Sequence, residues 1–336
     1  MTVSLRRQVF KALGGAMLVL GAISARAQVA PAGLVTPIPV IIDTDIGDDI
    51  DDAFAVGLAI SDPRLQVLGI TSAWGDTHKR VLLLRRLLAA AGRADIPLGE
   101  GVVTPDSTPF TQDRWAQGAK DKAPAPDAIA FIAAQVRQHP GQITLIELAP
   151  MSNLQALIQR YPDVLPKLKQ IAFMGGSVHM GYEKGSVIPN PVPDAEYNIA
   201  VAPAALSAVL ASGVSLAMFP LDSTQLKFDE VRRDRLFAYG SAQSDAITLL
   251  YHQWRLNNSW GQITPTLFDV IPVAWLIDPG LCPATPLRIA VDGKGYTRTL
   301  SGKPNVQACL ALHEDGAQKL IINALAPEAG INAPHQ

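Results

Sequence analysis

The sequence predicts a single α/β domain, in which a mostly parallel sheet is flanked by helices and followed by an antiparallel strand region near the C-terminus. Three observations support this class. Short, continuously apolar runs alternate with amphipathic runs of helical length, which is typical of parallel strands that helices cover on both faces. Apolar residues make up 48% of the 336 residues and charged residues 17%, so a sizeable core is expected. After residue 280 the alternation gives way to apolar runs separated by turns.

The N-terminus carries the three-part pattern of an export signal, with a positive start at residues 6–11, an apolar stretch at 12–24 and Ala-Arg-Ala at 25–27. The apolar stretch is too short to span a bilayer, and "RRQVFK" loosely resembles a twin-arginine signal. We expect a signal peptide over residues 1–27, a loose Pro-rich lead-in over 28–37 and the folded domain over 38–330. The protein would then be exported, either periplasmic or secreted.

Strands and helices are predicted in alternation from residue 38 onward. The strands are expected at Val40–Asp43, Gln66–Ser72, Ile143–Leu148, Gln170–Met174 and Val214–Phe219, and the helices at Asp51–Ile60, His78–Ala91, Asp127–Gln138, Ser152–Tyr161 and Ala202–Ala211. The Pro- and Gly-rich segment Thr104–Pro126 predicts a long loop, a feature that is often functional. Turns at Asp292–Gly295 and Ser301–Pro304 predict antiparallel strands, and a last helix is expected from about Glu314.

The net charge bears on the possible partners, and the two cysteines bear on disulfide formation. The net charge is −2 without a basic block, which argues against a nucleic-acid surface. Signal cleavage would leave 24 basic and 30 acidic residues, and no later stretch reads as transmembrane. Cys282 and Cys309 could form a disulfide in an exported protein or stay two buried thiols, and the sequence favours neither. A homo-oligomer is compatible with the sequence.

Six of the ten residues from Asp43 to Asp52 are aspartates, placed between the first strand and the first helix. In open α/β sheets ligands bind beyond the carboxyl ends of the strands. So many carboxylates at that place require a cation, and a hard divalent ion with oxygen ligands, calcium above all, suits them.

Other interpretations of the cluster explain less. An EF-hand needs Gly at loop position six and Glu at position twelve, but counting from Asp43 these positions hold Asp48 and Phe54. A phosphatase with an aspartate nucleophile could begin at Asp43, yet it leaves the last three aspartates of the cluster unexplained. A solvated helix start, where acids are favourable, accounts for two or three aspartates only.

The segment "DTDIGDDIDDAFA" resembles the N-terminal signature of the nucleoside hydrolases, the inosine–uridine-preferring ribohydrolase family. Further motifs follow in family order: "ITSAWGDT" (70–77), "IELAPMSNL" (146–154), "FMGGSV" (173–178), "NPVPDAEYNIAVAP" (190–203) and "LFDVIPVAW" (267–275). The resemblance covers about residues 38 to 280. It implies a Rossmann-like nucleoside-hydrolase fold and calcium-dependent hydrolysis of ribonucleosides to ribose and free base.

The resemblance also implies a role for individual residues. Asp45 is a metal ligand and the expected base for the attacking water, and Asp52 is a ligand. Asp51 is catalytic and should accept a hydrogen bond from a ribose hydroxyl. Asp269 and the backbone carbonyl of Ser152 complete the metal site. Asp43 supports the site, and Asp76, Asn190, Glu196 and Asn198 bind the substrate, with Glu196 and Asn198 on one face of an extended segment.

Departures from the family pattern leave alternatives open. Two extra residues precede the Asp51-Asp52 pair, so Asp49 could displace one of the pair as a metal ligand or lie behind it. Many relatives have His where Phe268 stands, and that His helps the base to leave. Candidates to replace it lie in "YHQWRLNNSWG" (251–261), namely His252, Trp254 and Trp260, although this segment could equally be a helix with a core aromatic face.

The same departures allow two alternative functions. The chain could hydrolyse another N-riboside, or it could bind a nucleoside or sugar without turnover while keeping the metal site. Phe268 and Asp76, which stands where many relatives have Asn, favour the second alternative.

Overall fold

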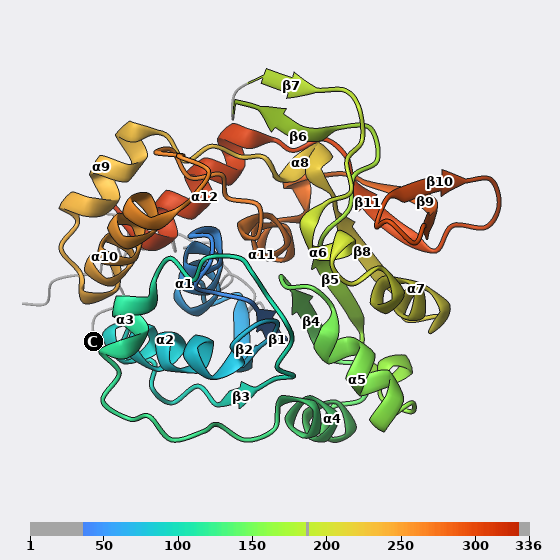
Figure 1. Ribbon diagram of the computed structural model, residues 1–336, viewed down its shortest axis with the longest axis horizontal. Helices are drawn as coiled ribbons and strands as arrows, with labels where there is room; N and C mark the ends of the chain where they lie inside the picture. The colour runs from blue at the N-terminus through green and yellow to red at the C-terminus, as the bar shows by residue number, and fades with distance from the viewer. Residues whose placement is uncertain (1–35, 186–187, 329–336) are drawn as a thin grey trace, which may run out of the picture. The chain divides into compact units, whose positions relative to one another are not determined.

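A computed structural model describes residues 36–185 and 188–328, which fold around one nine-stranded sheet (Figure 1). The strand order is β10-β9-β11-β8-β5-β4-β1-β2-β3. The seven strands from β11 to β3 are parallel, and β9 pairs antiparallel with both β11 and β10 at one edge. This confirms the predicted fold class, including the antiparallel region. The expected signal peptide lies outside the described residues.

The five predicted strands form the parallel part of the sheet together with one short strand that sequence patterns did not reveal and one strand of the predicted C-terminal region. The strands are β1 (Ile38–Thr44), β2 (Leu65–Ser72), β3 (Leu98–Glu100), β4 (Thr144–Glu147), β5 (Gln170–Met174), β8 (Leu216–Phe219), β9 (Ala284–Val291), β10 (Thr297–Leu300) and β11 (Val306–Cys309). A separate hairpin, β6 (Gly181–Lys184) and β7 (Ile188–Asn190), stands apart from the sheet. The unpredicted β3 and β7 have three residues each, too short for a periodic pattern.

Helices cover both faces of the sheet and bury a separate core on each. One face carries α1 (Asp51–Ser61), α2 (Thr77–Ala90), α10 (Ala242–Asn257), α11 (Val270–Ile277) and α12 (Glu314–Leu325), and the other carries α4 (Ala128–Gln138), α5 (Ser152–Arg160) and α7 (Pro203–Ala211). Within β1, Val40 and Ile42 belong to the first core and Ile41 to the second. Successive side chains of a strand point to opposite faces, so this strand is apolar throughout.

Short helices complete the chain. They are α3 (Asp113–Gln117), α6 (Tyr197–Ala200), α8 (Leu221–Thr224) and α9 (Glu230–Ala238). Helix α3 interrupts the segment Thr104–Pro126, so only part of the predicted long loop is irregular. None of the helices in the described part of the chain is long and apolar enough to cross a membrane.

Strands β1 and β4 lie side by side at the point where the chain changes faces. The helix after β1 packs in the first core, whereas the helix after β4 packs in the second. After the carboxyl ends of these two strands the chain therefore continues toward opposite faces of the sheet. A crevice remains between the two strand ends, and ligands bind at such a crevice in open α/β sheets. The aspartates that follow β1 lie at this crevice.

A disulfide joins Cys282 to Cys309, with their Cα atoms 5.6 Å apart. It connects the segment before β9 to the end of β11, so it fastens β9 to the neighbouring strand with which it pairs antiparallel. Of the two alternatives that the sequence left open, the structure has the paired one.

Candidate active site

The loop between β1 and α1, residues 45–50, carries the centre of the aspartate cluster and is called the aspartate loop below. Thr44 fixes its start, because the Thr44 hydroxyl accepts the Ile46 N–H at 3.1 Å and donates to the Asp52 carboxylate. Gly47 has a φ of 129°, and a Cβ there would lie 2.3 Å from the Phe110 ring. Both the backbone conformation and the close packing of Phe110 therefore require glycine.

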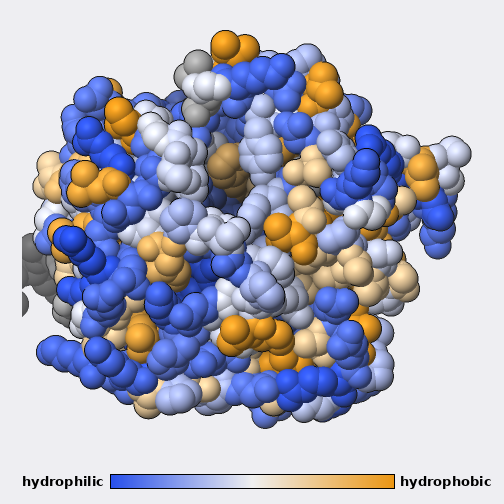
Figure 2. Space-filling view, in the orientation of Figure 1, coloured by the Kyte–Doolittle hydropathy of each residue, from blue (hydrophilic) through white to orange (hydrophobic). Residues whose placement is uncertain are grey.

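A cavity of about 330 Å³ lies over the aspartate loop. Its lining residues are Asp45, Asp48, Asp49, Asp51, Asp52, Thr108, Leu148, Met174, Tyr182, Glu196, Tyr197, Asn198, Trp260, Gln262, Phe268 and Asp269. Figure 2 shows a recess near the centre of the viewed face, with hydrophilic side chains around much of its rim. Carboxylates and aromatic rings thus share one cavity, a combination that suits a polar sugar joined to a flat base.

Three carboxylates converge at the cavity. Asp45, Asp52 and Asp269 are all buried, and each places one oxygen within 4.8 Å of the other two. Asp269 lies just before α11, far along the chain from the aspartate loop. Burial is the largest cause that raises the pKa of each, and neighbouring carboxylates raise them further. The structure therefore brings together three of the residues predicted to bind the metal.

The charge balance of this cluster fits a cation. Arg80 partly offsets the raised pKa values of Asp45 and Asp52. For Asp269, burial raises the pKa most, and all four neighbouring carboxylates raise it further. Ionised carboxylates this close together in a buried site need a compensating charge. A donor set made only of oxygen atoms matches a hard divalent ion.

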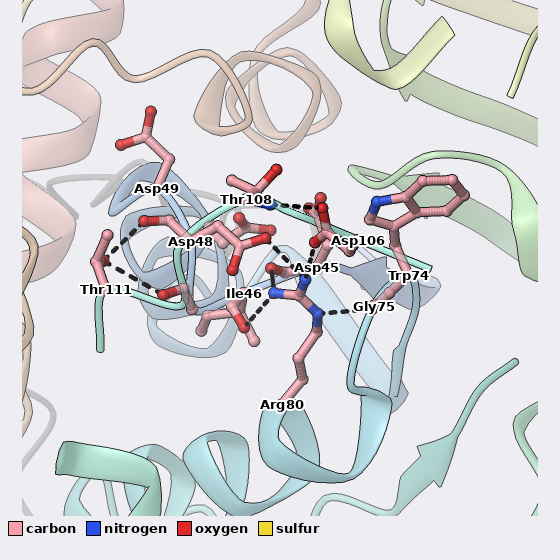
Figure 3. Close-up of polar contacts among 12 residues, drawn as sticks. Asp45, Ile46, Asp48, Asp49, Trp74, Gly75, Arg80, Asp106, Thr108 and Thr111 are labelled. Atoms are coloured by element: carbon pink, nitrogen blue, oxygen red, sulfur yellow. Dashed lines mark hydrogen bonds and ion pairs between the residues drawn. The ribbon is translucent and has the colours of Figure 1, made fainter. Parts of the chain in front are cut away.

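The remaining aspartates have different surroundings. Asp51 lines the cavity, and its Oδ2 accepts the backbone N–H of Asp269 at 3.1 Å. Asp49 also lines the cavity but lies outside the three-carboxylate cluster, and burial raises its pKa to about 6. In Figure 3 its side chain points away from Asp48 and Arg80. The sequence left open whether Asp49 or Asp52 joins Asp45, and in the structure it is Asp52 that lies beside Asp45 in the cluster.

Asp43 lies behind the cavity rather than in it. It is fully buried, and its Oδ1 accepts hydrogen bonds from the Thr71 hydroxyl and from Asn153 Nδ2, the latter at 2.8 Å. Burial raises its pKa to about 6. Glu147 is its cross-strand neighbour on β4 and has a raised pKa, caused by burial first and then by Asp43. This placement is the one expected for a supporting residue.

The structure places Ser152 away from the three carboxylates. Ser152 is the first residue of α5, so its carbonyl is directed into the first turn of that helix, and the residue lines a second cavity with Trp74. Leu148 instead lines the main cavity, directly after β4, and its carbonyl oxygen accepts Asn198 Nδ2 at 3.0 Å. Of these two residues of one motif, Leu148 and not Ser152 therefore lines the cavity that the carboxylates share.

The predicted ribose-binding segment is only partly extended. Glu196 caps α6, and its carboxylate accepts the backbone N–H groups of Gly176, Asn198 and Ile199. Burial raises its pKa to about 7, although these three hydrogen bonds oppose the shift. Glu196 and Asn198 both line the cavity, whereas Asn190 is outside it and hydrogen bonds to Asp194. The extended conformation expected for this segment was wrong because the chain turns into a helix at Tyr197.

Two other predicted substrate contacts lie away from the cavity. Asp76 caps α2 by accepting the Lys79 N–H at 3.1 Å. His252 is exposed and stacks on Phe237, because α10 turns its buried face, with Trp254, toward the core. Trp260, in contrast, lines the cavity.

Several cavity residues were not anticipated from the sequence. Tyr182 packs edge-on against Phe268, with the ring centroids 6.2 Å apart, and its hydroxyl accepts the Tyr197 N–H at 2.9 Å. Thr108 and Tyr197 join their hydroxyls at 2.8 Å on the cavity wall. Tyr197 could have been inferred from its place between Glu196 and Asn198. Thr108 and Tyr182 lie in segments without a periodic or spaced signal.

Comparisons with known proteins show which family the chain resembles. The sequence model of the family "Inosine-uridine preferring nucleoside hydrolase" matches residues 40–319. The "Pyrimidine-specific ribonucleoside hydrolase RihA" of Shewanella sp. (strain ANA-3) is 29% identical over 86% of this chain and 96% of its own length. That of Escherichia coli O127:H6 is 27% identical over 86% and 98%.

Solved structures show the same fold. A plant nucleoside hydrolase, the PpNRh1 enzyme, superposes with a TM-score of 0.74 at 24% identity and covers 87% of this chain and 99% of its own. A purine-preferring ribonucleoside hydrolase from Gardnerella vaginalis gives a TM-score of 0.69 at 20% identity over 87% and 100%.

Proposed function

Since this chain belongs to the inosine–uridine preferring nucleoside hydrolase family, it hydrolyses the N-glycosidic bond of ribonucleosides, and we propose that calcium and Asp45 are central to the reaction. The observation that carries the proposal is the convergence of Asp45, Asp52 and Asp269 within 4.8 Å at the cavity. These three carboxylates and the Leu148 carbonyl would hold the ion. All four are oxygen donors, which calcium accepts in flexible numbers.

Cleavage of the glycosidic bond passes through a sugar with oxocarbenium character, and it needs an activated water on one face of the sugar. A bound divalent ion lowers the pKa of water and binds vicinal hydroxyls. Asp45 is the proposed base that takes the proton from the attacking water, because its carboxylate lies in the three-carboxylate cluster and lines the cavity. The Thr44 hydroxyl accepts the N–H, and Arg80 binds the carbonyl, of the peptide unit that joins Asp45 to Ile46, and these two contacts orient Asp45.

The ribose is proposed to lie between the aspartate loop and α6. Asp51, Glu196 and Asn198 line this part of the cavity and would bind the ribose hydroxyls. Glu196 is held by three backbone N–H groups, and Asn198 donates to the carbonyls of Leu148 and Met174. Both side chains are therefore fixed before substrate arrives, which favours orientation of the sugar.

The base is proposed to occupy the aromatic part of the cavity, formed by Tyr182, Trp260 and Phe268. Tyr182 and Phe268 contact each other edge-on, which leaves an apolar surface for a flat ring. No histidine lines the cavity within the described residues. The proposed reaction therefore depends on how well the base leaves without a histidine as its acid.

We also propose that the protein is exported. The pattern of residues 1–27 supports this, and so does the Cys282–Cys309 disulfide, because disulfides persist mainly in oxidising compartments.

Two measurements test the proposed function. Elemental analysis of protein purified without chelator is expected to find calcium, and EGTA is expected to abolish turnover. In addition, a 2′-deoxynucleoside lacks a hydroxyl that Asp51, Glu196 and Asn198 would share, so kcat/KM should fall by about a hundredfold or more. A metal-free enzyme with full activity contradicts the calcium assignment, and equal rates on ribo- and deoxyribonucleosides contradict the ribose assignment.

A further inference from the structure

The buried guanidinium of Arg80 connects the aspartate loop to a second segment of the cavity wall (Figure 3). Arg80 lies in the first turns of α2, and only 1% of its surface is exposed. Its Nε donates to the Trp74 carbonyl at 2.8 Å, and its Nη1 donates to the carbonyls of Asp45 and, at 3.2 Å, Ile46. Its Nη2 pairs with Asp48 at 2.8 Å. The planar fork of arginine can serve these acceptors together, and the point charge of lysine cannot.

Nη2 of Arg80 also reaches a second segment, residues 104–112, which is called the strap below. It lies 3.5 Å from Asp106 Oδ2. The far end of the strap is fastened to the aspartate loop, because the Thr111 hydroxyl donates to the Asp48 carbonyl at 2.7 Å and Gln112 Nε2 donates to the Asp49 carbonyl at 2.6 Å. Arg80 thus closes a ring of contacts between the two segments.

The strap contributes directly to the cavity wall. Asp106 Oδ1 accepts the Thr108 N–H at 2.9 Å and the Tyr197 hydroxyl at 3.4 Å. The Thr108 and Tyr197 hydroxyls are 2.8 Å apart, and both residues line the cavity. A continuous set of polar contacts therefore runs from Arg80 through Asp106 to this hydroxyl pair.

The position of Asp48 also depends on Arg80. Asp48 is 7% exposed, and its Oδ1 has no hydrogen-bond partner among the described residues. Arg80 is the cation that pairs with its other oxygen. A buried carboxylate that loses its partner is strongly unfavourable, so without the guanidinium the aspartate loop would have to rearrange.

We propose that Arg80 is a positioning residue for the reaction: it fixes the aspartate loop and the strap relative to each other, so that the ion-binding carboxylates and the Thr108–Tyr197 hydroxyl pair form one preorganised wall. The first half of this inference rests on the ion site proposed above. The second half concerns the substrate side of the cavity and stands on the contacts of Asp106.

Two substitutions test the ion-site half and the strap half of the proposal separately. Arg80→Lys keeps the charge but loses the fork, so the calcium Kd and the KM are both expected to rise, each by roughly tenfold, since small misplacements of reacting groups have large effects. Asp106→Asn keeps the shape of the side chain and removes the charge that Asp106 presents to Arg80. It should raise KM about threefold to tenfold and leave the calcium Kd within about twofold, as expected for the loss of one charge-assisted contact. The double variant should raise KM by less than the product of the two effects, because both act through one contact.

A matched control is Arg86→Lys on the same helix. Arg86 lies over the Trp115 ring at 3.9 Å and donates to the Trp115 carbonyl, away from the cavity. This variant should leave KM and the calcium Kd unchanged. Thermal melts should be recorded for every variant, so that the constants are compared well below each Tm.

A purely structural role for Arg80 makes a different prediction. In that case Arg80→Lys lowers Tm or yield while KM and the calcium Kd of the folded protein stay within twofold of the wild type, and this result overturns the proposal. A wild-type KM for Asp106→Asn overturns the strap half alone. If the wild type itself binds no calcium, the proposed ion site fails, and the KM values of Asp106→Asn and Arg80→Lys still decide the strap half.

Discussion

Replacing Asp269 by Asn should change stability in opposite directions with and without the metal ion. Asn has nearly the same shape, and the Asp269 side chain does not cap α11, so the substitution leaves neither a void nor an uncapped helix. What it removes is one charge from a buried cluster of three. Without the ion that charge is repelled by its neighbours, and with the ion it is a ligand.

The repulsion can be estimated from the geometry. Two unit charges 4.8 Å apart repel by about 3.5 kcal/mol at an effective dielectric constant of about 20. Asp269 faces both Asp45 and Asp52 at that distance or less. Protonation relieves much of this repulsion, because a crowded buried carboxyl gives up its charge. We therefore expect the free energy of unfolding of the metal-free variant to be about 1–3 kcal/mol higher than that of the metal-free wild type.

The ion reverses the order. Calcium at a thousand times its Kd stabilises a one-site protein by about 4.1 kcal/mol. At roughly 2 °C per kcal/mol for a chain of this size, the wild type should gain about 8 °C in Tm when calcium is added. Asp269→Asn should begin about 2–6 °C higher in EGTA, on the same conversion, and gain little from calcium.

Differential scanning calorimetry in EGTA and in calcium measures all four values. Asp121→Asn is a suitable control, since the Asp121 side chain is 67% exposed and makes only surface contacts, an ion pair with Arg85 at 3.5 Å and a hydrogen bond from the Ala123 N–H at 2.9 Å. Its Tm should follow that of the wild type in both buffers. A metal-free Asp269→Asn protein that melts below the metal-free wild type would refute the repulsion argument. A variant that keeps the full calcium increment would show that Asp269 is no ligand.

Three further predictions concern other parts of the chain. Phe268 lines the cavity, and no histidine is among the described residues that line it. We therefore expect p-nitrophenyl riboside to turn over about a hundredfold faster than uridine, and His252→Ala to leave that ratio unchanged. Near-equal rates on the two substrates contradict this prediction. Because Glu196 has a pKa of about 7 and acts as an acceptor when ionised, kcat/KM should rise with pH and level off above about 7, and Glu196→Gln should remove that step from the profile. Replacing Cys282 and Cys309 by Ser removes a disulfide that spans 27 residues, so the free energy of unfolding measured in urea should fall by about 3.5 kcal/mol. The kcat should stay unchanged, because neither residue lines the cavity. An unchanged stability or a lower kcat contradicts this prediction.

The parallel centre of the sheet was predictable because each of its long strands is buried on both faces and is therefore apolar throughout. The predicted ends of these five strands differ from the observed ones by at most two residues. The three-carboxylate cluster was also predictable, since each of its members belongs to a motif with fixed spacing. The position of β1 beside β4 then brings the motifs to one edge, as the rule for ligand sites in such sheets requires.

The parts that sequence could not give depend on contacts between distant segments. Ser152 and Leu148 belong to the same motif, and only the start of α5 shows that Leu148, and not Ser152, lines the main cavity. His252 and Trp260 lie in one segment, yet the end of α10 between them leaves one on the surface and places the other at the cavity. Spacing along the chain carries no information about such turns.

The structure gives the six aspartates different surroundings, which explains how so many carboxylates lie together. Asp43 accepts hydrogen bonds from a hydroxyl and an amide behind the cavity, Asp48 pairs with the Arg80 guanidinium, and Asp49 and Asp51 each accept a backbone N–H. Asp45 and Asp52 join Asp269 and are left for an ion. Arg80 of α2 thus supplies the cation that the aspartate loop itself lacks. Without this guanidinium Asp48 would be buried and unpaired, so the aspartate loop and Arg80 form one structural unit.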